Sequence, residues 1–175
     1  MGNQEQSLCF VEQWGSTTAA KHVVGTRTDY LLLSSSMRLR ITTLSLIAPI
    51  KSPIVIKLKM LDIDTLKFVH QKTFNLTPNG SKAPYFNYNF KRAPYLKRSG
   101  TLLLMCEITG GPTYTFNKSK HSILADNKIQ ITISRDLPKH IQRLISMPED
   151  SVPAHIFQGM KFVADDQEIS WYYCT

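Results

Sequence analysis

The chain has 175 residues, of which 42% are hydrophobic and 19% are charged, a composition that excludes disorder throughout and allows one domain with a true core. Its formal net charge is +8, from 21 lysines and arginines against 13 aspartates and glutamates. Such an excess makes polyanions attractive partners, either nucleic acid or the acidic face of a membrane.

Residues 1–28 are rich in Gln, Ser, Thr and Gly and predict a flexible polar amino-terminal arm, followed by a globular domain over residues 29–175. The arm carries one apolar island, "LCFVEQW", with Leu8, Phe10, Val11 and Trp14. Because the arm cannot build a core of its own, the island must pack on its own domain or on another molecule. Packing on its own domain is favoured, and an aromatic hook that docks into a neighbour is the alternative.

From Tyr30 the hydrophobic pattern has period two, which is typical of half-buried strands. In "MRLRI" the apolar residues share one face, and Arg38 and Arg40 share the other. Thr42 and Thr43 then shift the phase, which predicts a bulge or bend in a long strand.

Two further strands are expected after the loop "APIKSP". In "PIVIKLKML" four apolar side chains alternate with outward-facing ones that include Lys57 and Lys59, and "LKFVHQKTFNL" follows as the next strand, ending in the turn signal "TPNGS". For any single lysine, solvation of a half-buried sheet is a sufficient explanation.

The stretch "YNFKRAPYLKRSGTLLLMCEI" places Lys91, Arg92, Lys97 and Arg98 directly before the most apolar run of the chain. The run from 101 to 108 predicts a central strand covered on both faces. One or two cations would serve to keep that strand from aggregating, but there are four, interleaved with aromatic residues. We therefore expect a basic and aromatic surface loop for phosphates or lipid headgroups, worth about 4 kcal/mol at an anionic membrane.

The second half predicts a strand at "KIQITIS", a helix over "LPKHIQRLIS" capped by Asp136, and a short second helix from Ser151 with Pro153 in its first turn. A closing hairpin is expected from "FQGMKFVA" and "EISWYYC". The fold class is therefore α+β: a single compact domain with a mainly antiparallel twisted β-sheet packed with one or two helices in the C-terminal third.

The sequence contains no nucleophile elbow, P-loop, dinucleotide fingerprint or HExxH motif, so we predict no enzyme, no cofactor and no metal. Asp62 and Asp64 lie on one face of a strand end, as metal sites and acid catalysts require, but a turn is the favoured explanation. Three widely spaced cysteines, Cys9, Cys106 and Cys174, indicate reduced thiols in the cytosol, with Cys106 inert inside the apolar strand.

The order of these features resembles the matrix proteins of rhabdoviruses. The resemblance is carried by "NFKRAPYLKRSGTLLLMCEI", an aromatic and basic stretch before a long apolar strand, and by the ending "HIFQGMKFVADDQEISWYY". It covers roughly residues 30 to 173 and concerns pattern and order, without a diagnostic motif. The chain lacks the PPxY and P[ST]AP sequences and the lysine-rich arm of the animal members, so it is more similar to the short members from plant-infecting viruses.

The resemblance implies a non-enzymatic virion protein of the host cytoplasm and peripheral membrane, which self-associates, condenses the helical nucleoprotein–RNA complex and coats the anionic inner leaflet. It places self-association at Leu8, Phe10, Val11 and Trp14. A viral glycoprotein tail and RNA itself are further partners that it leaves open. The implied membrane or ribonucleoprotein contacts are the eight cations Arg38, Arg40, Lys57, Lys59, Lys91, Arg92, Lys97 and Arg98.

Two other classes of function are compatible with the sequence. The first is a nucleic-acid-binding β-protein, such as a small jelly-roll capsid subunit or a movement-protein-like domain. A basic arm would support a capsid subunit, but residues 1–20 contain no Lys or Arg. The second is an enzyme of unrecognised type centred on Asp62 and Asp64.

Overall fold

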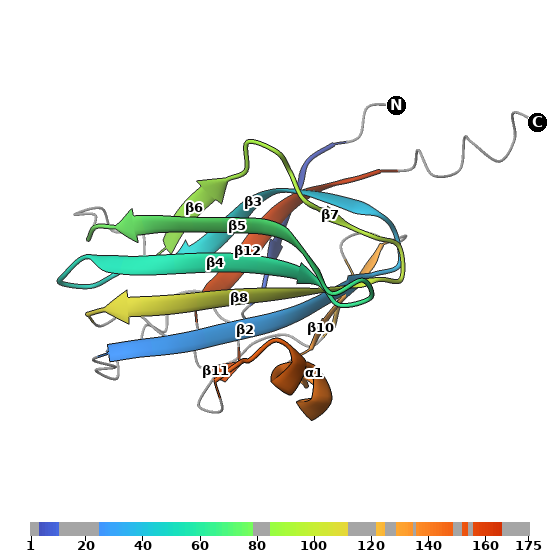
Figure 1. Ribbon diagram of the computed structural model, residues 1–175. Helices are drawn as coiled ribbons and strands as arrows, with labels where there is room; N and C mark the ends of the chain where they lie inside the picture. The colour runs from blue at the N-terminus through green and yellow to red at the C-terminus, as the bar shows by residue number, and fades with distance from the viewer. Residues whose placement is uncertain are drawn as a thin grey trace, which may run out of the picture.

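The computed structural model describes residues 4–10, 25–78, 85–111, 122–124, 129–134, 136–148, 152–153 and 156–165. Two mainly antiparallel sheets stack face to face as a β-sandwich (Figure 1). The prediction of a mainly antiparallel β-protein is therefore confirmed, but the strands form two sheets where a single sheet was expected.

The smaller sheet has five strands. Its order is β1 (Gln6–Cys9), β12 (Phe157–Ala164), β3 (Leu39–Ile47) and β6 (Tyr85–Asn89), and the two-residue β7 (Tyr95–Leu96) also pairs with β3. The three strands that pair with β3, namely β12, β6 and β7, are all antiparallel to it. The predicted strand at "FQGMKFVA" is thus β12, whereas its expected hairpin partner lies outside the described residues.

The larger sheet has seven strands. Its order is β5 (Lys67–Leu76), β4 (Ile54–Asp62), β8 (Thr101–Gly110), β2 (Gly25–Ser35), β10 (Gln130–Ser134) and β9 (Ser122–Leu124), and β11 (Val152–Pro153) pairs with β2. The apolar strand β8 lies between β4 and β2. Alternate β8 residues join two different apolar clusters, so the predicted burial of both faces is confirmed.

The core between the sheets follows the period-two patterns of the sequence. Ile54, Ile56, Leu58 and Met60 of β4 are fully buried and pack against inward-facing residues of β3 and β12. Burying one such side chain stabilises the fold by about 1.5–3 kcal/mol. The alternation of apolar side chains along each strand therefore holds the two sheets together.

A β-bulge interrupts β3 where the sequence changes phase. Thr43 pairs with Lys161 and Ile41 pairs with Phe162, which leaves Thr42 without a partner in the β3–β12 register. Ile41 and Leu44 are both fully buried on either side of this irregularity. The predicted bulge is confirmed, and its effect is to keep the apolar set facing inward on both sides.

Aromatic side chains close the sandwich where β5 and β6, the edge strands of the two sheets, lie opposite each other. Phe74 stacks on Tyr88 with ring centroids 5.2 Å apart, and His70 meets Phe90 edge-on at 4.8 Å. The expectation of a basic and aromatic surface loop is wrong for Tyr88 and Phe90. They are half-buried because β6 pairs with β3 and turns them toward the core.

The α+β assignment is not confirmed, because the described residues contain one short helix, α1 (Lys139–Leu144). The cap is Pro138 rather than Asp136, since the extended ψ of 136° at Pro138 delays the helix to Lys139. The second helix predicted from Ser151 is wrong. Val152 and Pro153 form a short parallel bridge to Asp29 and Tyr30 of β2, and this pairing replaces local helical bonds.

Helix α1 covers the outer face of the larger sheet at one end (Figure 1). Leu137, Ile141 and Ile145 belong to an apolar cluster with Leu103 and Met105 of β8. Leu144, which the helical pattern placed on the same face, is 61% exposed and does not belong to this cluster. No helix in the described ranges is long and apolar enough to span a bilayer.

Candidate anion-binding surfaces

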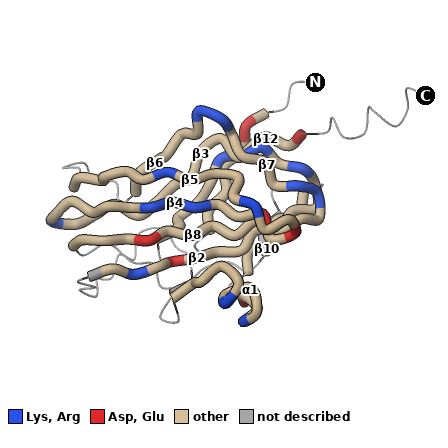
Figure 2. Tube along the Cα trace, viewed as in Figure 1, with Lys and Arg blue, Asp and Glu red and all other residues tan. Residues whose placement is uncertain are grey.

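The first candidate site is a cavity of about 580 Å³ at one end of the sandwich. Arg38 reaches it from the start of β3, and Arg92 and Lys97 reach it from the segment that joins β6 to β8. The other lining residues are Asp62, Val69, Ala93, Pro94 and Tyr95. Blue segments that mark lysine and arginine gather at this end, beside β7 (Figure 2). We call this cavity the basic end.

Two of the three cations at the basic end are held by neighbouring groups. The guanidinium of Arg38 lies 4.2 Å from the centroid of the Tyr95 ring, and its Nη1 lies 3.7 Å from Asp165 Oδ2. Lys97 Nζ lies 3.0 Å from Asp62 Oδ2. Arg92 is exposed and has no ion pair within the described part of the chain. With Arg38 paired to Asp165 and Lys97 paired to Asp62, Arg92 supplies the excess positive charge by which the basic end attracts anions.

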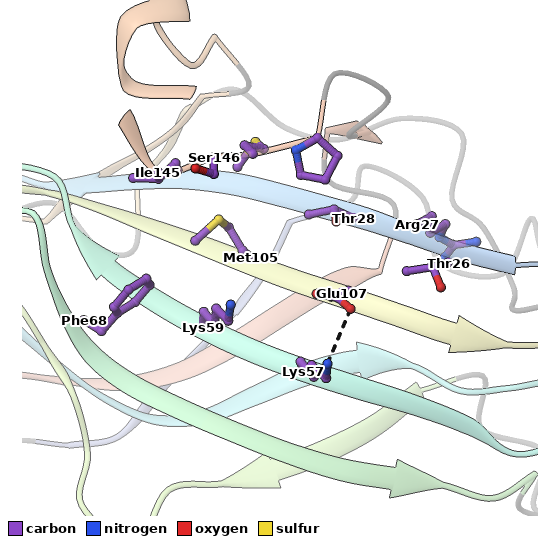
Figure 3. A pocket seen from close by; sticks show the side chains of 12 residues that line it. Thr26, Arg27, Thr28, Lys57, Lys59, Phe68, Met105, Glu107, Ile145 and Ser146 are labelled. Carbon is purple, nitrogen blue, oxygen red and sulfur yellow. Dashed lines mark ion pairs between the residues drawn. The ribbon is translucent and has the colours of Figure 1, made fainter. Parts of the chain in front are cut away.

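The second candidate site lies on the outer face of the larger sheet and has a volume of about 330 Å³ (Figure 3). Lys57 and Lys59 project into it from β4, and Glu107 of β8 lies 3.6 Å from Lys57 Nζ. Its apolar wall is contributed by Phe68 of β5, Met105 of β8 and the residues after α1, namely Ile145, Met147 and Pro148. We call this cavity the sheet-face cavity.

The eight predicted contact cations divide between several places. Arg38, Arg92 and Lys97 share the basic end, and Lys57 and Lys59 share the sheet-face cavity. Arg40 is exposed on β3, where it pairs in register with Tyr95. The remaining two, Lys91 and Arg98, are exposed and line neither cavity. Sequence order alone could not show this division, because it follows from the order of strands in the two sheets.

The predicted self-association residues are placed in part. Leu8 is 7% exposed and Phe10 is fully buried in the core of the same chain. Strand β1 pairs with β12, and the Phe10 amide donates to the carbonyl of Gln158 at 2.8 Å. Val11 and Trp14 lie outside the described residues. The favoured expectation, that the island packs on its own domain, holds for Leu8 and Phe10.

Asp62 and Asp64 form a turn. Asp62 Oδ1 accepts hydrogen bonds from the amides of Asp64 and Thr65 at 2.9 and 3.4 Å, and Asp64 Oδ2 accepts one from Thr101 at 3.3 Å. Burial by itself would raise the pKa of Asp62, but Lys97 and the two amides together lower it. No group of three metal-ligating side chains occurs in the described ranges. The turn interpretation therefore accounts for both carboxylates.

Two acidic residues that sequence analysis did not single out control the charge of these sites. Asp165 and Glu107 each pair with one of the predicted contact cations. Glu107 faces Lys57 in the β4–β8 register, so strand pairing would have identified it. Asp165 follows the last β12–β3 pair, Ala164 with Leu39, and its amide donates to the Arg38 carbonyl at 2.9 Å, so strand pairing would have identified it as well.

No protein-family model matches the chain, and no curated protein matches its sequence.

Proposed function

We propose that this protein is a non-enzymatic viral structural protein of the matrix type. It self-associates, condenses a helical nucleoprotein–RNA complex and bridges that complex to the anionic inner leaflet of a membrane. The observation that supports this proposal most directly is the basic end, where Arg38 is brought beside Arg92 and Lys97. The net charge of +8 supports the same conclusion.

The anionic contact at the basic end is weak in a single copy and strong in an array. Each cation near an anionic bilayer contributes about 1 kcal/mol, and salt screens this contribution. Three cations therefore give at most about 3 kcal/mol, a dissociation constant on the order of several millimolar, and the ion pairs of Arg38 and Lys97 weaken the contact further. Many copies on one membrane or nucleocapsid convert this weak contact into stable attachment.

The membrane contact is tested by flotation with phosphatidylcholine vesicles that contain phosphatidylserine. The variant Arg92→Gln with Lys97→Gln removes two exposed cations of the basic end, and we expect about tenfold weaker flotation from the loss of about 2 kcal/mol. The matched control is Lys139→Gln with Arg143→Gln, two exposed cations of α1. Equal loss in both variants would show that net charge alone, and not the basic end, drives binding.

Self-association is proposed to use exchange of β1 between copies. The groove that holds Leu8 and Phe10 is the same in every copy, so a neighbour's β1 can make the same contacts. Ser7 pairs with Lys161, and a disulfide between cysteines at these two positions reports which chain supplies β1. Exchange predicts a disulfide-linked dimer from Ser7→Cys with Lys161→Cys, whereas only intrachain bonds at high protein concentration would exclude it.

A second candidate function is RNA binding by a β-sandwich of the small capsid or movement-protein type. The observation in its favour is the stacking of two sheets with a single short helix among the described residues. Single-stranded RNA binding at matched salt distinguishes the two functions. A steep salt dependence with RNA and no flotation would favour this candidate over the matrix proposal.

A further inference from the structure

Three exposed apolar side chains cluster at the start of β5. Leu66 is 42% exposed, Phe68 is 46% exposed and Val69 is 42% exposed, and Lys67 between them is also exposed. Strand β5 is the edge of the larger sheet, and seven of its ten residues are exposed. We call residues 66–69 the apolar tip.

We propose that the apolar tip inserts into an anionic lipid bilayer. This inference rests on the proposed function and names the segment that enters the membrane. The apolar tip enters the acyl region of the bilayer, while the flanking cations contact the headgroups.

The tip lies between the two basic surfaces. Phe68 lines the sheet-face cavity together with Lys57 and Lys59, and Val69 lines the basic end together with Arg38, Arg92 and Lys97. Phe68 and Val69 reach different surfaces because Val69 is the extra residue of a β-bulge: Leu61 pairs with Phe68, and Met60 pairs with His70. Apolar residues with cations on both sides match the polarity profile of an anionic bilayer surface.

The turn that presents the tip is held in one conformation. The Leu66 amide donates to the Asp62 carbonyl at 2.8 Å, and Leu66 adopts a left-handed φ of 56°. Asp62 also pairs with Lys97, and the Ile63 amide donates to the carbonyl of Thr101 at 3.0 Å. Because the tip is already ordered, little conformational entropy is lost when it inserts.

The chemistry of the tip favours lipid over the other classes of partner. Aliphatic side chains such as Leu66 and Val69 do not stack on bases, so a nucleic acid would leave them exposed. A second copy would bring the same lysines and arginines against each other at the tip, which is unfavourable. A bilayer buries the apolar side chains and neutralises the cations at once.

The experiment compares vesicle binding of the full chain and two variants. The tip variant is Leu66→Asn, Phe68→Thr and Val69→Thr, in which Asn tolerates the left-handed backbone and Thr keeps strand propensity. The control is Val55→Thr with Leu144→Gln, which removes exposed apolar side chains elsewhere on the molecule. On phosphatidylserine-containing vesicles we expect the tip variant to bind at least about tenfold more weakly, and the control to bind normally.

Insertion depth gives a second readout that a loss of folding would not imitate. In the full chain with Phe68→Trp, we expect additional fluorescence quenching by lipids brominated on the acyl chain, compared with the unsubstituted protein. Normal vesicle binding by the tip variant, or no additional quenching at position 68, would overturn the inference while leaving the proposed function in place. Failure of the unsubstituted protein to bind acidic vesicles would overturn both.

Discussion

Asp29 lies fully buried in β2 with Arg27 as its ionic partner, Arg27 Nε being 3.2 Å from Asp29 Oδ1. Asp29 Oδ2 has no hydrogen-bond partner among the described residues. Burial raises the pKa of Asp29 to about 6, although Arg27 and the backbone at Ile156 oppose this rise. The core therefore contains a carboxylate whose charge is unfavourable at neutral pH.

The first prediction concerns the pH dependence of stability. Because the folded pKa of Asp29 is about 6 and the ordinary value is 3.8, the folded state binds the proton more tightly than the unfolded state. The contribution of Asp29 to stability is therefore full below pH 3.8 and is lost as the pH rises through 6, a change of about 3 kcal/mol. In Asp29→Asn, the free energy of unfolding measured with urea should no longer show this decrease between pH 3.8 and pH 6. An unchanged profile would contradict the assignment, and Asp136→Asn, an exposed aspartate, is the control.

The second prediction concerns the turn between β4 and β5. Asp62→Ala removes two acceptor contacts and the ion pair with Lys97, so we expect the free energy of unfolding to fall by about 1–2 kcal/mol. Asp62→Asn keeps the acceptor oxygen and should lose about half as much. The pKa of Asp62 is lowered in the folded state, so its contribution is present above the ordinary pKa and is lost in acid. Equal effects of Ala and Asn would argue against the turn role.

The third prediction concerns β1. Phe10→Ala should destabilise the monomer by about 3–5 kcal/mol, because it empties a fully buried site in the core. If Phe10 instead docked only into a neighbouring molecule, Phe10→Ala would weaken association and leave the stability of the monomer unchanged. Thermal unfolding at low protein concentration separates these outcomes. Phe68→Ala, on an exposed phenylalanine, is the matched control and should cost much less.

The fourth prediction concerns thiol reactivity. Cys106 is fully buried, and burial raises the pKa of its thiol well above the ordinary value, with the charge of Asp29 adding to the effect. We expect maleimide to label Cys9, which is partly exposed, before Cys106 in the native protein. Both sites should label after unfolding, as measured by peptide mass spectrometry. Rapid native labelling of Cys106 would show that β8 opens readily.

The predictions from sequence that succeeded are those that depend only on the spacing of residues along one strand. Side chains alternate across a strand whatever its neighbours are, so the buried set Ile54, Ile56 and Leu58 could be assigned from spacing alone. The phase shift at Thr42 and Thr43 was equally local, and it corresponds to the bulge in β3. The prediction of a helix from Ser151 was wrong because the long-range pairing of Val152 with Asp29 competes with local hydrogen bonds in so short a segment.

The sequence by itself determined the long strands β3, β4 and β8, the two-sided burial of β8 and the excess of positive charge, because each depends on residue type and near-neighbour spacing. Tertiary structure decided which cations meet. Arg38 joins Arg92, and Asp165 approaches Arg38, only because strands distant in the chain are adjacent in the sandwich. Tertiary structure also left Leu66, Phe68 and Val69 in solvent, since they lie where the sheet edge ends and no other described strand covers them.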